Sequence, residues 1–149
     1  MSKSTITVKQ SILIKKDKES VWDFTQNYEN RSKWDSSVLS HEIISNLPAR
    51  IVKLKIRGGT EMTFFYKVDD KPNKTILSAK DIKSPILKSG GGIWEYMEHE
   101  NSTIWHQSNT LGFKPNLFLA MLLPFYKFIF GYQTKAAMKK AKHLIEGIK

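Results

Sequence analysis

The sequence contains no cysteine. This excludes disulfide bonds, thiolate metal sites, a cysteine nucleophile and thiol redox switching. The four histidines are scattered along the chain, so a zinc site is not expected either. The three consecutive glycines at positions 90–92 lack the Lys-Ser/Thr that completes a nucleotide-binding loop. We therefore predict a protein without a metal ion or an organic cofactor.

Long apolar segments are also scarce. The first ten residues, MSKSTITVKQ, lack the apolar core and small-residue cleavage site of a secretory signal. The longest apolar run, Leu117–Phe130, is interrupted by Pro124 and Lys127 and is shorter than the roughly 20 residues that cross a bilayer. We expect a cytoplasmic protein in which this run does not span a membrane.

Acidic residues are few: 14 stand against 24 Lys and Arg, which gives a net charge of +10. Half of this excess lies in residues 127–149, where Glu146 is the only acid. Such a balance favours anionic partners, namely phosphate backbones, acidic lipid headgroups or an anionic small ligand, although a solvated basic face has the same composition. No helix-turn-helix, zinc finger or ribonucleoprotein motif is present, so nucleic acid is not expected as a partner.

The first 34 residues predict one strand followed by two short helices. Apolar side chains alternate with mostly polar ones over residues 5–15, the period of a half-buried strand. Asp17 can then cap a helix over Lys18–Gln26. A second short helix is expected over Tyr28–Trp34.

From Val38 to about Phe113 the pattern changes to short alternating segments separated by turn residues, which is typical of an antiparallel meander. The predicted strands are Val38–Ser45, Arg50–Arg57, Thr60–Asp69, Thr75–Asp81, Gly91–His99 and Ser102–Phe113. The glycines at 90–92 indicate a bulge or a sharp bend. After Pro115-Asn116 the chain reads as helical, and Pro124 and Gly131 predict a kinked helix or two consecutive helices.

This order of elements resembles the SRPBCC helix-grip superfamily, which includes polyketide cyclases/dehydrases, START lipid-transfer proteins and birch-pollen-allergen proteins. The matching segments are Ile12-Leu13-Ile14, Asp17–Phe24, Asn30–Trp34, Gly92–Tyr96 and Ser102-Thr103. The resemblance implies an α+β fold in which a seven-stranded curved antiparallel sheet wraps around the C-terminal helix, as one domain over residues 1–149. It also implies a cavity for a hydrophobic ligand, but no particular reaction.

A hairpin turn at Glu100-Asn101, where Asn tolerates the left-handed conformation, fixes which side chains share a face. It pairs Trp94 with Gln107 and Tyr96 with Trp105 on one face, and Glu95 with His106 on the other. We place the aromatic face toward the cavity, because large aromatic side chains suit the wall of an apolar pocket. The candidate ligand-binding residues, which could instead fill the core, are Trp34, Met62, Phe64, Tyr66, Trp94, Tyr96, Trp105, Phe118, Met121, Leu122 and Phe125.

Three functions are open at this point. The first is binding or transport of a hydrophobic small molecule or lipid, with the basic C-terminal region directed toward acidic membranes. The second is a cofactor-free cyclase or dehydratase acting on an aromatic or polyketide-like substrate, with Glu95 and His106 as acid and base; it requires that pair to face inward. The third is a partner or dimer surface formed by Leu117–Phe130, so the protein is expected as a monomer or a homodimer.

Overall fold

The computed structural model describes residues 4–148; residues 1–3 and 149, which the single-domain prediction includes, lie outside the described residues. The elements are β1 (Thr5–Ile14), α1 (Lys18–Gln26), α2 (Tyr28–Trp34), β2 (Val38–Ser45), β3 (Ile51–Ile56), β4 (Thr60–Asp70), β5 (Lys74–Lys83), β6 (Leu87–His99), β7 (Ser102–Phe113) and α3 (Leu117–Glu146). Each predicted strand and helix is present. The largest difference in bounds is at β6, which begins at Leu87 instead of Gly91.

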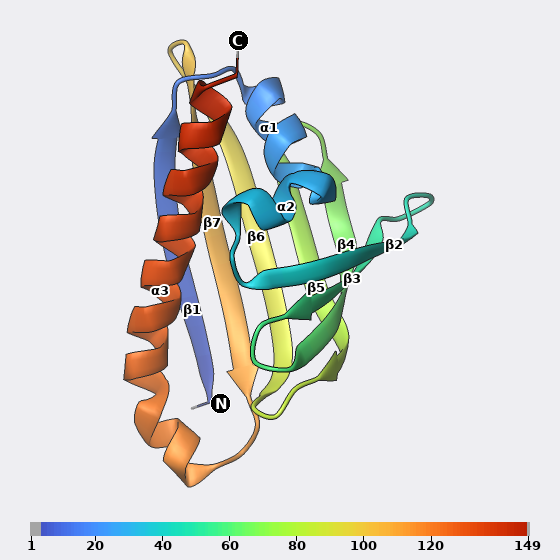
Figure 1. The fold of residues 1–149 in the computed structure, drawn as a ribbon, viewed down its shortest axis with the longest axis vertical. Helices are drawn as coiled ribbons and strands as arrows, with labels where there is room; N and C mark the ends of the chain where they lie inside the picture. The colour runs from blue at the N-terminus through green and yellow to red at the C-terminus, as the bar shows by residue number, and fades with distance from the viewer. Residues whose placement is uncertain (1–3, 149) are drawn as a thin grey trace.

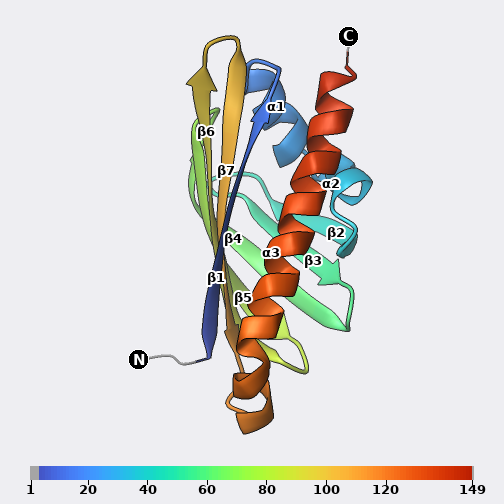
Figure 2. The ribbon, with the colours of Figure 1, turned by 90° about the vertical axis from the view of Figure 1, so that its left-hand side faces the viewer.

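The seven strands form one antiparallel sheet in the order β1-β7-β6-β5-β4-β3-β2. Figures 1 and 2 show the sheet curving so that α3 runs along its inner side next to β1, while α1 and α2 cover one end. This arrangement confirms the predicted α+β helix-grip fold.

Polar side chains define where the helices begin. Asp17 precedes α1 and its side chain accepts a hydrogen bond from the Ser20 backbone N–H at 3.0 Å. Asn27 separates α1 from α2 and caps α2 in the same way, and Asn116 accepts from two backbone N–H groups at the start of α3. Each of these side chains satisfies N–H groups that have no partner within the helix.

The β6–β7 register is the predicted one. Trp94 lies opposite Gln107, and Tyr96 lies opposite Trp105. The turn differs in detail, because the residue in the left-handed region is Glu100, with φ +54°, and not Asn101.

Of the two alternatives predicted for the glycines, a bulge or a sharp bend, the bulge is wrong. Gly90, Gly91 and Gly92 pair in regular register with β7, and the irregularity lies earlier, between Leu87 and Ser89. The missing side chains at 90–92 therefore do not mark a bulge. At Gly90 the missing side chain leaves space on the inner face of the sheet.

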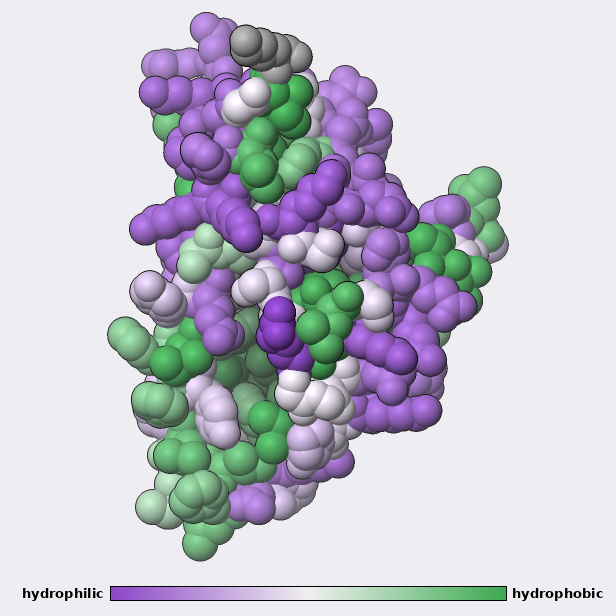
Figure 3. Space-filling view, in the orientation of Figure 1, coloured by the Kyte–Doolittle hydropathy of each residue, from purple (hydrophilic) through white to green (hydrophobic). Residues whose placement is uncertain are grey.

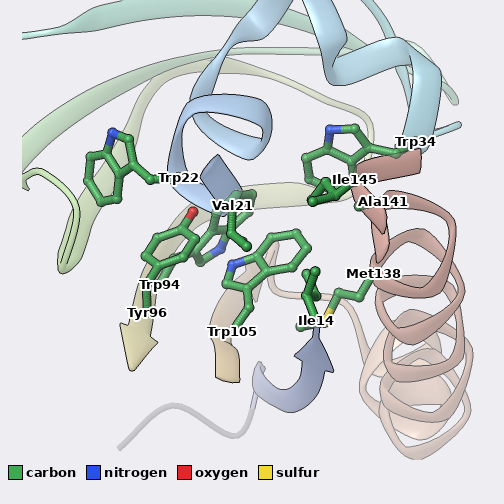
Figure 4. Close-up of a cluster of buried hydrophobic side chains, with 10 residues drawn as sticks. All are labelled: Ile14, Val21, Trp22, Trp34, Trp94, Tyr96, Trp105, Met138, Ala141 and Ile145. Atoms are coloured by element: carbon green, nitrogen blue, oxygen red, sulfur yellow. The ribbon is translucent and has the colours of Figure 1, made fainter. Parts of the chain in front are cut away.

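The largest core cluster lies at the end of the molecule that α1 and α2 cover (Figure 4). It contains Ile14, Val21, Trp22, Trp34, Trp94, Tyr96, Trp105, Met138, Ala141 and Ile145. The three residues from α3 come from its second half, which the sheet and α2 therefore hold in place.

Helix α3 is continuous through Pro124, so the chain forms one helix here and not two. Its first half is largely exposed, and Figure 3 shows apolar residues gathered over it at the lower end of the molecule. Among residues 4–148, α3 is the one helix that is long and apolar enough, by length and composition, to cross a membrane. The expectation that no segment spans a membrane was based on Leu117–Phe130 alone and is therefore not confirmed. The cytoplasmic location stays a prediction.

Candidate ligand cavity

A cavity of about 780 Å³ lies between the inner face of the sheet and α3. Its wall includes five of the predicted ligand-binding residues: Trp34, Met62, Phe64, Tyr66 and Trp94. Because these side chains come from α2, β4 and β6, the wall is assembled by the curvature of the sheet together with the packing of α2 across its end.

Two predicted residues lie in the core instead. Tyr96 and Trp105 are fully buried and are absent from the cavity wall. The Tyr96 hydroxyl lies 2.8 Å from Thr25 Oγ1 and accepts a hydrogen bond from Gln26 Nε2 at 2.7 Å. Tyr96 therefore joins α1 to the sheet, and burial is the main reason that its pKa is raised.

The predicted residues of α3 also lie away from the cavity. Phe118, Met121 and Phe125 are exposed, and Leu122 is half-buried but does not line the wall. The side chains of α3 that do line it are Tyr126, Ile129, Phe130, Tyr132, Gln133, Thr134, Ala136, Ala137 and Lys140. The cavity-lining part of α3 thus begins after the four predicted residues.

Gly90 and Gly92 form part of the cavity floor. Both lie on the face of β6 that also carries Trp94, because side chains in a strand alternate between faces. A Cβ atom at Gly90 would meet only ordinary contacts, the nearest being Ala79 Cβ at 3.4 Å. A Cβ atom at Gly92 would lie 2.9 Å from Asn109 Oδ1, which accepts a hydrogen bond from the Trp94 indole at 3.0 Å.

One charged pair is built into the cavity wall at the end of α2. Arg31 and Asp35 both line it, and Arg31 Nε donates to Asp35 Oδ2 at 3.0 Å. Tyr28, Arg31 and Trp34 are all buried, as their three-residue spacing on α2 places them on one face. Burial by itself lowers the pKa of Arg31, but the attraction of the Asp35 carboxylate outweighs it and leaves the pKa raised. Arg31 is therefore a buried permanent cation.

The opening of the cavity can be located from the lining residues that are exposed. These are Ser36, Arg57, Gly58, Tyr132, Gln133, Ala136 and Lys140. They come from the α2–β2 connection, the β3–β4 turn and the middle of α3. Arg57 is held there, since its Nε donates to the Ser36 carbonyl at 2.7 Å.

The alternative catalytic pair faces away from the cavity. Glu95 and His106 lie opposite each other, as predicted, but on the outer face of the sheet. Glu95 forms an ion pair with Lys74, and His106 Nδ1 lies 2.6 Å from Ser11 Oγ. The inward orientation that the enzyme hypothesis requires of this pair is therefore not present. Within residues 4–148, no three His, Asp or Glu side chains are grouped so that they could hold a metal ion.

Sequence analysis missed the polar part of the cavity. Arg31, Gln107 and Asn109 line the wall but were not among the candidates. The signals were available: Arg31 stands between Tyr28 and Trp34 at three-residue spacing, and the hairpin register places Gln107 beside Trp94.

Solved structures share this fold over almost the whole chain. An aromatase/cyclase from Streptomyces sp. R1128 superposes with a TM-score of 0.80 at 11% identity, covering 95% of this chain and 94% of its own. A START superfamily protein from Mycobacterium smegmatis gives a TM-score of 0.77 at 10% identity, covering 96% and 99%.

Sequence comparison adds one curated protein. An uncharacterised membrane protein of Bacillus subtilis strain 168, YndG, is 24% identical in an alignment of length 101 that covers 60% of this chain and 38% of that protein. No protein-family profile matches the sequence. The predicted resemblance is thus confirmed at the level of the fold: the chain has the helix-grip architecture of the START, SRPBCC and polyketide aromatase/cyclase proteins.

Proposed function

We propose that the protein binds a hydrophobic small molecule or lipid in the internal cavity and acts as its carrier or sensor. The observation that carries this proposal is the cavity itself, whose volume of about 780 Å³ lies in the usual range for small-molecule sites. Its wall is mainly aromatic and aliphatic, with a few polar groups, which is the composition of ligand pockets. The START and aromatase/cyclase proteins that share the fold support the same interpretation.

Cyclase activity on an aromatic or polyketide-like substrate is the alternative, favoured by the likeness to the aromatase/cyclase. Its acid and base would have to come from the cavity wall. Among the described residues 4–148, Asp35 is the only carboxylate in the wall, and it is already paired with Arg31. We therefore prefer binding to catalysis.

The first experiment is mass spectrometry of the purified protein under native and denaturing conditions, with organic extraction of anything released. We expect a co-purifying hydrophobic compound. The variant Gly90→Leu should reduce its occupancy, because the new side chain begins on the cavity floor, where a Cβ is tolerated. Ser108→Leu is the matched control, since it adds the same side chain to the outer face of the neighbouring strand β7.

The proposal is contradicted if the wild-type protein purifies without a ligand and also fails to take up a fluorescent fatty acid. Equal uptake by wild type, Gly90→Leu and Ser108→Leu would show that the fatty acid binds outside this cavity.

We also propose that the exposed half of α3 contacts an acidic membrane surface. Leu117, Phe118, Met121, Phe125 and Phe128 are all exposed there. Lys114 and Lys127 are exposed in the same segment, and the sequence contains no Asp or Glu between Lys114 and Glu146. Apolar side chains combined with basic ones are the two signals that hold a protein on an anionic bilayer. The name of the Bacillus subtilis relative is consistent with this proposal.

Vesicle co-sedimentation tests this contact. We expect binding to vesicles that contain phosphatidylglycerol, weaker binding to phosphatidylcholine alone, and loss of binding in Phe118→Ser/Phe125→Ser. The control is Leu47→Ser, which removes an exposed apolar side chain from the β2–β3 connection. If the wild-type protein instead does not bind vesicles and forms a dimer, while the double variant is a monomer, the surface is an interface between two copies.

A further inference from the structure

The guanidinium of Arg31 is unusual because it is buried beside an apolar cavity, and the four N–H donors on its two Nη atoms are unused among residues 4–148. Its relative exposure is 9%, and Nε is bonded to Asp35. Among residues 4–148, no acceptor forms a hydrogen bond with either Nη atom. The Nη atoms are also not among the fully buried side-chain atoms without partners, so they keep some accessible surface, and Arg31 lines the cavity.

Aromatic rings hold this cation without satisfying its donors. The Arg31 guanidinium carbon lies 4.9 Å from the ring centres of both Trp34 and Trp94. Such contacts stabilise a cation through the faces of the rings. The N–H groups still need acceptors, because a buried donor without a partner is costly. The remaining edge of the guanidinium suits a carboxylate, which accepts two parallel hydrogen bonds.

The other polar groups in the wall are consistent with an anion at this position. Gln107 Oε1 accepts from Asn109 Nδ2 at 2.8 Å, which leaves the Gln107 amide N–H groups as donors beside Trp94. The charged lining residues are Arg31, Arg57, Lys140 and Asp35, three cations and one carboxylate. A cavity with this excess of positive charge attracts an anionic ligand and raises its rate of entry.

We infer that the ligand is an anionic amphiphile whose carboxylate is held by the two free Nη groups of Arg31, at the end of the cavity wall that α2 forms. This inference rests on the proposed binding function and specifies the ligand's chemistry. The apolar part of the ligand lies against Ile86, Leu111 and Phe130, lining residues that pack in a separate cluster from Trp34 and Trp94. The binding mode places the charge beside α2 and the chain toward the first half of α3.

Calorimetric titration with dodecanoate and with its uncharged methyl ester, at pH 8, tests the inference. Hydrogen bonds to a charged group make the wild type prefer the carboxylate by about 10-fold to 100-fold. Arg31→Met should bind both probes equally and retain the wild-type affinity for the ester. Arg57→Met, which removes a cation at the opening, should retain most of the preference. Thermal unfolding of each variant shows whether it is folded.

If Arg31→Met does not fold, Asp35→Asn provides a second test, in which the preference for dodecanoate over the ester should increase. The substitution removes the carboxylate that pairs with the Arg31 guanidinium, so the variant should prefer dodecanoate more strongly than the wild type does. An unchanged or smaller preference contradicts the inference.

The outcomes separate this inference from the proposed function. Equal affinity of the wild type for acid and ester overturns the role of Arg31 and leaves hydrophobic binding intact. If Arg57→Met abolishes the preference and Arg31→Met keeps it, the carboxylate binds at the opening beside Arg57, and this result also overturns the inference. If the wild type binds neither probe, the proposed function fails together with the inference.

Discussion

Alanine substitution at two neighbouring glycines of β6 should affect stability in opposite directions. At Gly90 the new Cβ meets Ala79 Cβ at 3.4 Å and Leu111 Cδ2 at 3.8 Å, which are ordinary van der Waals distances. At Gly92 the new Cβ lies 2.9 Å from Asn109 Oδ1, so the amide of Asn109 has to move. That movement breaks its hydrogen bond with the Trp94 indole at 3.0 Å.

The expected magnitudes follow from these contacts. Replacing a glycine by alanine restricts the unfolded chain and stabilises the folded protein by about 0.4–1 kcal/mol where the side chain is accommodated. This term is common to Gly90→Ala and Gly92→Ala and cancels in their difference. The remaining difference is the loss of a partly buried hydrogen bond, about 1–3 kcal/mol, or roughly 4–8 °C in Tm for a 2 kcal/mol effect in a chain of this size.

Equilibrium unfolding in urea, followed by tryptophan fluorescence, measures the difference directly. We expect Gly90→Ala to match or exceed the wild type and Gly92→Ala to fall below it, with a changed native emission spectrum because Trp94 loses its partner. If both variants have the same free energy of unfolding and the wild-type emission spectrum, the Asn109 amide does not hold Trp94 and this account of the cavity floor is refuted.

Two further predictions concern the elements that position the cavity. Tyr96→Phe leaves the buried amide of Gln26 without its acceptor and should lower the free energy of unfolding by about 1–3 kcal/mol; Tyr132→Phe, at an exposed position, should be neutral in the same urea titration. Hydrogen bonds from Ser20 lower the pKa of Asp17 in the folded protein. The charged cap therefore contributes stability above the pKa that Asp17 has in the unfolded chain, and this stability is lost as the pH falls through the lower pKa of the folded protein. The stability advantage of the wild type over Asp17→Asn should therefore shrink on acidification, and an advantage that grows would contradict this cap.

The order of elements was predictable because each was encoded locally. Alternating apolar residues marked the strands, and Asp17 together with Pro115-Asn116 marked the starts of helices. The β6–β7 register followed from the length of one turn, even though the left-handed residue proved to be Glu100. Local patterns of this kind do not depend on which distant segments meet.

The cavity was less predictable because it depends on contacts between distant segments. A strand pattern assigns Trp94, Tyr96 and Trp105 to one face. Only the positions of α1 and α2 decide that the last two are covered while Trp94 reaches the cavity. Leu117–Phe130 is apolar on every side, so the sequence carries no periodic signal for the face that turns inward. A residue such as Arg31 is found only when its neighbours in space are known.

The two halves of α3 have different roles, and this division explains how the fold tolerates a cavity. Met138, Ala141 and Ile145 pack in the main aromatic cluster, which anchors the second half of the helix. The first half is held by a smaller cluster that includes Leu123, with Tyr126 and Phe130 packed against it. The main cluster therefore anchors the second half of α3, and the first half can expose apolar side chains without loss of the fold. Substitutions at Phe118 or Phe125 should for this reason change surface binding and leave the unfolding midpoint almost unchanged.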